Sequence, residues 1–384
     1  MHSIYCDHNS TTMIDERVVE AMVEAYKNAS ANPSSGHRWG RKTRVVLDEA
    51  REQIATLMGV KATEIVFTGS GSESDNLAIL GSLYSPDARG RHCITAATEH
   101  HAVLAASDWV RARGFEVTVL PVDNLGRIDP DDFRKAIRPD TQLATIMLAN
   151  NEVGTIHPIA ELARIAHEHG VWFHTDAVQA MGKIPVSIAD LDCDLLSLAS
   201  HKFYGPKGFG ILYVRSGLKL APVIAGGGQE LGRRAGTEDI AGAVGTAKAM
   251  QLLADDPDEM ARVAKIASEF RTRLTEAVDD MQVFGDPDNQ LPNTVGAGFA
   301  GIDGHSLMMA LDLRGIAVST GSACATGATK PSHVLTAMGV DDKYTSGTIR
   351  FSFGRYSKPD DARIIADAVA EDVKKLRAGV PVSS

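Results

Sequence analysis

Cysteine is scarce in this chain of 384 residues, which contains only four. They lie far apart and form no CxxC pair, so neither a zinc site nor a disulfide framework is expected. We therefore predict no bound metal, and a reducing compartment, the cytoplasm. Cys6, Cys93 and Cys193 have the neighbours of small buried side chains, whereas Cys324 does not.

Targeting signals and long apolar runs are also lacking. The N-terminus shows no basic stretch followed by an apolar one, so no signal peptide is predicted. No uncharged apolar stretch approaches the roughly 20 residues that a membrane helix needs. The formal net charge of -10 does not favour DNA, RNA or an anionic membrane as a general partner.

The usual nucleotide-binding motifs are missing as well. In Gly69-Ser70-Gly71-Ser72, the third glycine of a GxGxxG motif is replaced by Ser74, and no Gly-Lys-Ser/Thr follows. Small residues before a predicted helix can still bring backbone N–H groups close to a phosphate. An ordinary tight turn would show the same sequence.

From about residue 45 to residue 250, short apolar stretches alternate with amphipathic ones. Strands are expected at 65–67, 92–96, 116–121, 143–148, 171–174, 195–199 and 210–214, and helices at 44–57, 74–83, 102–113, 130–136 and 159–168. This alternation predicts an α/β fold with a mainly parallel sheet covered by helices. Ligands bind such sheets at the carboxyl ends of the strands.

The length of the chain favours two domains. After a long helix, Asp255-Asp256-Pro257-Asp258 interrupts the helical pattern, and we place the boundary there. Residues 15–255 would form the large domain, and residues 1–14 and 256–384 a smaller α+β domain. In the latter we expect strands near Gln282, Val295 and Ile349, and helices at 260–279 and near Ser306 and Asp360.

Lys202 follows the predicted strand 195–199, in a segment that Gly205, Pro206 and Gly208 keep irregular. A lysine held against apolar surroundings loses its charge easily and becomes an amine nucleophile, the form that makes Schiff bases. A single lysine is more often an ordinary surface residue. Whether Lys202 is such a nucleophile therefore depends on the other residues at the same edge of the sheet.

Three other polar residues fall at this edge. Asp176 ends an apolar strand and is either a helix N-cap or the acidic partner of a protonated pyridine nitrogen. His100 is either structural or placed to stack on a flat cofactor and exchange protons. Asn151 follows a further strand and offers an amide.

The C-terminal part contributes a thiol and two arginines. Ten of the twelve residues at 318–329 are small or hydroxylic, which predicts a mobile loop around Cys324. This cysteine is either an incidental thiol or a reactive one. Arg350 and Arg355 are candidates to clamp a substrate carboxylate, although surface arginines are commoner.

Taken together, these motifs resemble those of the cysteine desulfurases of the NifS/IscS type, which are fold-type I pyridoxal phosphate enzymes. The resemblance extends from residue 5 to residue 352. Its strongest matches are Ser200-His201-Lys202, Asn150-Asn151-Glu152-Val153-Gly154, Asp176-Ala177-Val178-Gln179, Arg234-Ala235-Gly236-Thr237 and Gly321-Ser322-Ala323-Cys324. Two departures are Ala199, where the family usually has serine, and Ser72, where it usually has threonine.

The resemblance implies a role for each of these residues. Lys202 would form the Schiff base with pyridoxal phosphate, and Cys324 would be the nucleophile. At the cofactor ring, Asp176 would contact the pyridine nitrogen, Gln179 the ring hydroxyl, and His100 would stack on the ring. Asn151 would face cofactor and substrate, and Arg350 would bind the substrate carboxylate. The phosphate would be held by Gly71, Ser72, Ser200 and His201, with Thr237 supplied by the second subunit of a homodimer.

The function implied is conversion of L-cysteine to L-alanine, with the sulfur left as a persulfide on Cys324. A sulfur-acceptor or iron–sulfur scaffold protein would take this sulfur for iron–sulfur cluster assembly or tRNA thiolation. A selenocysteine lyase and a class V aminotransferase are the alternatives. The loop around Cys324 argues against the aminotransferase.

Overall fold

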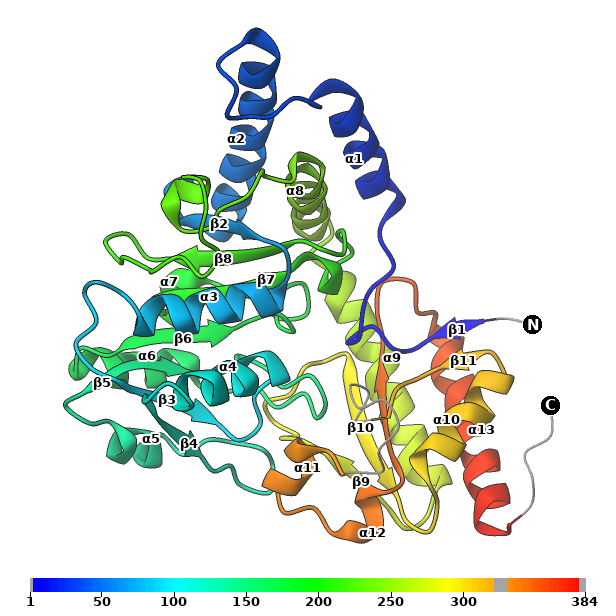
Figure 1. The fold of residues 1–384 in the computed structure, drawn as a ribbon. Helices are drawn as coiled ribbons and strands as arrows, with labels where there is room; N and C mark the ends of the chain where they lie inside the picture. The colour runs from blue at the N-terminus through cyan, green and yellow to red at the C-terminus, as the bar shows by residue number, and fades with distance from the viewer. Residues whose placement is uncertain (1–2, 321–330, 380–384) are drawn as a thin grey trace.

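The computed structural model describes residues 3–320 and 331–379 (Figure 1). The predicted loop at 318–329, with Cys324, therefore lies outside the described residues except for 318–320. In the described part of the chain, no helix is long and apolar enough to cross a membrane.

A large mixed sheet dominates the first two thirds of the chain. Its strands are β2 (Ile65–Thr68), β3 (His92–Ala96), β4 (Glu116–Leu120), β5 (Thr141–Thr145), β6 (Trp172–Asp176), β7 (Leu195–Ala199) and β8 (Gly210–Val214). Within the described residues their order is β2-β8-β7-β6-β5-β3-β4. β8 runs antiparallel to both of its neighbours, β2 and β7, whereas β4, β3, β5, β6 and β7 pair in parallel, so the predicted mainly parallel sheet is confirmed.

Helices cover both faces of this sheet (Figure 1). The helices of this part of the chain are α1 (Glu16–Asn28), α2 (Arg38–Met58), α3 (Gly71–Leu83), α4 (His101–Arg111), α5 (Pro130–Ala136), α6 (Ile159–Glu168), α7 (Ile188–Leu191) and α8 (Ile240–Asp255), with short 3₁₀ turns η1 (Ala62–Glu64), η2 (Ser200–Lys202) and η3 (Glu230–Gly232). Of these, α1 packs against α8 and not on the sheet itself.

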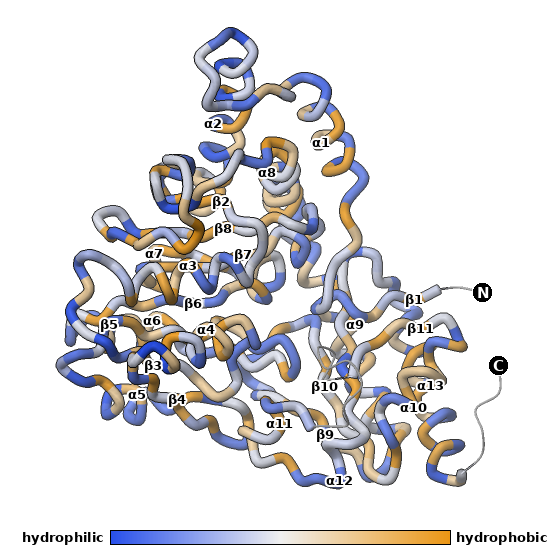
Figure 2. Tube along the Cα trace, viewed as in Figure 1, coloured by the Kyte–Doolittle hydropathy of each residue, from blue (hydrophilic) through white to orange (hydrophobic). Residues whose placement is uncertain are grey.

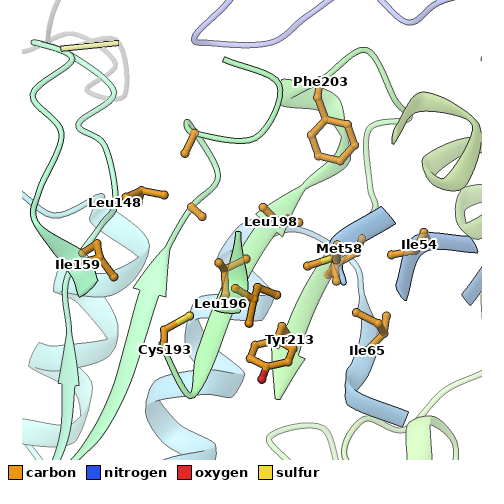
Figure 3. Packing of buried hydrophobic residues seen from close by; sticks show 14 of the residues in the cluster. Ile54, Met58, Ile65, Leu148, Ile159, Cys193, Leu196, Leu198, Phe203 and Tyr213 are labelled. Carbon is orange, nitrogen blue, oxygen red and sulfur yellow. The ribbon is translucent and has the colours of Figure 1, made fainter. Parts of the chain in front are cut away.

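Alternate side chains of the central strands enter different cores, as the two-residue period of a strand requires. Leu196 and Leu198 of β7 pack in one cluster with α2, α6 and α8, whereas Leu195 packs in another with α3 and α4. Figure 3 shows Leu196 and Leu198 in the same cluster as Ile54 and Met58 of α2. Both faces of β7 are thus buried, which fixes the position of its carboxyl end.

The C-terminal third forms a second unit with its own core. Strands β9 (Met281–Phe284), β10 (Thr294–Phe299) and β12 (Thr348–Ser352) make an antiparallel sheet. Its helices are α9 (Glu259–Ala277), α10 (Gly304–Leu313), α11 (His333–Ala337), α12 (Asp342–Thr345) and α13 (Pro359–Arg377). Phe270, Phe299 and Phe351 are at the centre of its apolar cluster.

The N-terminal segment joins this second unit. Strand β1 (Ile4–Tyr5) pairs in parallel with β11 (Ile316–Ala317), and Asp7 pairs with Ser352.

Figure 2 shows hydrophilic residues in the outer loops beside β4 and α5. The division into 15–255 and 1–14 with 256–384 remains our prediction, and the separate apolar cores support it.

Candidate active site

A cavity of about 520 Å³ lies at the carboxyl ends of the parallel strands. The chain after β3, β5, β6 and β7 forms one side, and residues of the second unit form another. Of the residues singled out from the sequence, the cavity brings together Gly71, Ser72, His100, Asn151, Asp176, Gln179, His201, Lys202 and Arg350.

Ser200 is a correction to the prediction from sequence. Its side chain does not line the cavity, because its buried hydroxyl accepts a hydrogen bond from Thr246 Oγ1 at 2.8 Å. It is also packed against Gly205, where an added Cβ would lie 2.0 Å from Ser200 Oγ. Ser200 therefore supports the turn before Lys202 and is not placed to bind a phosphate.

Two other predicted residues are not part of this cavity in the described chain. Thr237 is exposed to solvent and lies outside the cavity wall. Cys324 lies outside the described residues. The chain on both sides of residues 321–330 nevertheless reaches the cavity wall, since Ser319 pairs with Arg350 and Ser332 lines the cavity.

The N-terminus of α3 lies in the wall of the cavity. Ser70 is the N-cap of this helix, and its Oγ accepts a hydrogen bond from the backbone N–H of Glu73 at 3.1 Å. A Cβ on Gly71 would lie 2.9 Å from Val178 Cγ2 and 3.2 Å from the Cβ of Ala199. Only glycine fits this close approach, which is the geometry that a phosphate-binding helix start requires.

Lys202 lies on η2, directly after β7, with its side chain at the cavity. Its Nζ donates to the carbonyl oxygens of Asn9 and Ser10 at 2.7 and 2.6 Å. The neighbouring His201 shares a hydrogen bond of 3.1 Å with Thr11 Oγ1, and burial lowers the pKa of His201 to about 4. The N-terminal segment thus holds both side chains.

Asp176 ends β6 and accepts a hydrogen bond from the backbone N–H of Val178 at 2.9 Å. Burial raises the pKa of Asp176, while His100 and Lys202 oppose this increase. A carboxylate in this position favours a cationic group in the cavity. A protonated pyridine nitrogen meets that requirement.

Asp75, which the sequence analysis missed, also faces the cavity. It is 1% exposed, its Oδ1 has no hydrogen-bond partner, and His174 Nε2 lies 3.8 Å away. Burial first, and then the charge of Asp176, raise the pKa of Asp75 well above its usual range. The neutral form of Asp75 is thus favoured, because a second carboxylate charge would be repelled by Asp176.

His100 is the N-cap of α4, and its Nδ1 accepts a hydrogen bond from the backbone N–H of Ala102 at 3.1 Å. This contact assigns the proton of the neutral ring to Nε2. Burial lowers the pKa of His100, so the ring is neutral near pH 7. The two interpretations of this histidine are therefore compatible, since it caps a helix and also lines the cavity.

The structure separates the two candidate arginines. Arg350 lines the cavity from β12, and its guanidinium donates to the carbonyl oxygen of Asn151 at 3.0 Å. Arg355 instead forms ion pairs with Asp15 at 2.7 Å and Glu259 at 2.6 Å. Only Arg350 is placed to bind a carboxylate in the cavity.

Several residues of the site were not recognised in the sequence. They are Asn9, Asp75, Glu152 and Lys183, and they lie in the cavity wall or directly behind it. Asn9 and Glu152 lie inside stretches that carry the family resemblance, and their position there is the signal that could have identified them as site residues. Asp75 and Lys183 showed no signal, because polar residues at these spacings are usually exposed.

Comparisons with known proteins identify the class. The aminotransferase class-V family matches residues 4–365, so the chain belongs to this family, whose members depend on pyridoxal phosphate. The cysteine desulfurase IscS of Dictyoglomus turgidum is 46% identical over 379 residues, which cover 98% of this chain and 96% of the relative. This protein is therefore an enzyme of the cysteine desulfurase type.

Solved structures agree with this assignment. The structure of a NifS-like protein is 36% identical in sequence and has a TM-score of 0.90, and the match covers 98% of this chain and 100% of the NifS-like chain. SspA in complex with cysteine is 36% identical with a TM-score of 0.81, and matches 93% of this chain and 100% of its own. The resemblance seen in the sequence and the fold-type I architecture are both confirmed.

Proposed function

We propose that this enzyme converts L-cysteine to L-alanine and leaves the sulfur on Cys324 as a persulfide. The proposal depends chiefly on one observation, which is that a single cavity combines Lys202, Asp176, His100 and Arg350 with the N-terminus of α3. These are a nucleophilic amine, an anionic carboxylate, a neutral imidazole, a carboxylate-binding guanidinium and an anion cradle.

The residues present fit pyridoxal phosphate. The N–H groups of Gly71 and Ser72, together with His201, would hold the phosphate, and the amine of Lys202 would hold the aldehyde carbon. Asp176 would pair with the ring nitrogen, while Gln179 would contact the ring oxygen. When bound, this cofactor accepts the negative charge that develops on the substrate's α-carbon.

The protein's own groups would orient the substrate and move its protons. Arg350 would bind the carboxylate of L-cysteine, and the amide of Asn151 would face the substrate beside it. The amine of Lys202 would remove the α-proton, and its hydrogen bonds to Asn9 and Ser10 favour an amine that stays at this edge of the cavity. His100, with Nε2–H toward the cavity, would handle a proton near the ring.

Sulfur transfer needs a thiolate close to the substrate. The Cys324 thiolate would attack the substrate sulfur, so that an S–S bond forms while the Cβ–S bond breaks. The electron pair of that bond stays on the carbon skeleton, which takes up a proton at Cβ, regains the α-proton and leaves as alanine. Because this is the same elementary step as disulfide exchange, thiolate fraction and access should govern its rate.

We propose a homodimer in which Thr237 of one subunit contacts the cofactor phosphate of the other. The exposed apolar side chains of Val19, Val23, Tyr26 and Trp39 on α1 and α2 support an interface at that end of the molecule (Figure 1). The persulfide would pass to an acceptor protein in a reducing compartment such as the cytoplasm. Iron–sulfur cluster assembly and tRNA thiolation both consume sulfur of this kind.

The test is to mix the holoenzyme with L-cysteine and a thiol reductant, then quantify alanine and sulfide. Equal amounts of both products are expected. Transfer of the amino group to an added keto acid without sulfide would instead identify an aminotransferase and contradict the proposal.

A further inference from the structure

A buried lysine that the proposed reaction does not use lies behind the cavity. Lys183 is 5% exposed, and its Nζ donates to Asn9 Oδ1 at 2.8 Å and to Gln179 Oε1. The charged groups that act on it are Lys202 and Arg350, and His8 and His201 also face it. Its surroundings thus contain cations and imidazoles.

Such surroundings disfavour the positively charged form of the Lys183 amine. Burial, and then the charges of Lys202 and Arg350, hold the pKa of Lys183 well below its usual range. A neutral amine carries two N–H groups, and Lys183 has two acceptors, one on Asn9 and one on Gln179. The two hydrogen bonds that Lys183 donates are therefore the number that the neutral form of this amine can make.

The contacts of Gln179 fix which way its amide faces. Gln179 Nε2 donates to the carbonyl oxygen of Asn9 at 2.9 Å, and a carbonyl oxygen can only accept. The other amide atom, Oε1, must then face Lys183, which donates to it. Together, Asn9 and Lys183 select one of the two orientations of this amide.

The selected orientation matters for the cavity that Gln179 lines. Its nitrogen has a second N–H beyond the one given to Asn9, so the amide presents a donor. The flipped amide would present a carbonyl oxygen, which repels an oxygen atom of a ligand. The same carbonyl of Asn9 accepts from Lys202 Nζ at 2.7 Å, so this network joins Lys183 to the active-site amine.

We propose that Lys183 is a positioning residue, which holds the Gln179 amide as a hydrogen-bond donor toward the cavity. The inference rests on the proposed function, in which Gln179 contacts the ring oxygen of pyridoxal phosphate. Lys183 does not line the cavity and acts through Gln179, which does. A donor to the anionic ring oxygen lowers the pH at which the bound cofactor gains its proton.

The experiment titrates the visible absorption of the bound cofactor against pH and measures cofactor dissociation by equilibrium dialysis. In Lys183→Met, the titration midpoint should rise by about one pH unit, and cofactor affinity should fall about tenfold. Gln179→Leu should show the same shift, and the double variant should shift no further than Gln179→Leu alone.

Thr294→Val is the matched control. It removes a partner of Asn9 Nδ2 at 2.9 Å without touching Gln179, so its midpoint should equal that of the wild type. If Lys183→Met does not accumulate as folded holoenzyme, Lys183→Gln decides instead. It keeps N–H donors, so its midpoint should stay near the wild-type value, and a midpoint equal to that of Gln179→Leu would overturn the proposal.

An unchanged midpoint in Lys183→Met, or a shift that adds to that of Gln179→Leu, would also overturn it. Failure of the proposed function would give a different experimental result from failure of the role of Lys183. In that case, wild-type protein would bind pyridoxal phosphate without forming alanine from L-cysteine, whatever the titrations show.

Discussion

The guanidinium of Arg350 donates to the carboxylate of Asp7 at 2.8 Å, so the candidate substrate clamp is already held on one side by the N-terminal segment. Its Nε has no hydrogen-bond partner among the described residues, although the side chain is buried. A buried, unpaired donor beside a cavity is a site for an anion. The substrate carboxylate can bind there while Asp7 and Asn151 keep the side chain in place.

Arg350→Gln should therefore raise the KM for L-cysteine about 10- to 100-fold, because a charge-assisted contact with the substrate is lost. Steady-state kinetics on the holoenzyme measure this. Arg355→Gln is the matched control, since it removes the ion pair of Glu259 and one of the two arginines paired with Asp15, and it should cost about 3 kcal/mol of stability with an unchanged KM. A larger rise in KM for Arg355→Gln than for Arg350→Gln would reverse the assignment.

Lys202→Ala should abolish covalent attachment of the cofactor and lower turnover of L-cysteine at least about 100-fold. Borohydride reduction followed by peptide mass spectrometry should place the cofactor on Lys202 in the wild type and on no peptide in the variant. The exposed Lys207 provides the control, because Lys207→Ala should retain the label. Labelling of another lysine in both proteins would remove Lys202 from its proposed role.

Glu152 should make the stability of the protein dependent on pH. Burial raises its pKa from 4.5 to about 7, although Ser332 donates a hydrogen bond of 2.5 Å to it. Between pH 4.5 and pH 7, the folded state keeps a proton that the unfolded state releases. The free energy of unfolding therefore falls as the pH rises through this window, and the loss is complete above pH 7.

Glu152→Gln lacks this penalty and still accepts a hydrogen bond from Ser332. Its free energy of unfolding should exceed that of the wild type by a margin that grows with pH toward about 3 kcal/mol. Chemical denaturation at several pH values measures the margin. The exposed Glu276→Gln should show none, and a pH-independent margin for Glu152→Gln would contradict the explanation.

Much of the fold follows from the sequence because the central strands are buried on both faces. Leu195-Leu196-Ser197-Leu198-Ala199 is apolar except for Ser197, which is typical of a covered strand, and β7 spans these same residues. Helix α1 was missed, and its apolar residues face both ways, since Val18 and Ala25 are buried whereas Val19 and Val23 are exposed.

The site was predictable where one residue ends a strand, and not where two distant segments meet. Asp176 and Lys202 could be placed at one sheet edge because each lies at the carboxyl end of a predicted parallel strand. The contact of Asn9 with Lys202, and that of Lys183 with Asn9, join the N-terminal segment to the sheet and leave no periodic signal. Ser200 was misassigned because sequence proximity to Lys202 does not say which way its hydroxyl turns.

The central claim is that sulfur leaves L-cysteine for Cys324, and a single-turnover reaction without reductant tests it most directly. Peptide mass spectrometry should find the mass of one added sulfur atom on the peptide containing Cys324, together with one alanine for each active site. Cys324→Ala should keep the cofactor absorption and lose both products. Alanine formed at the wild-type level by Cys324→Ala would contradict the account.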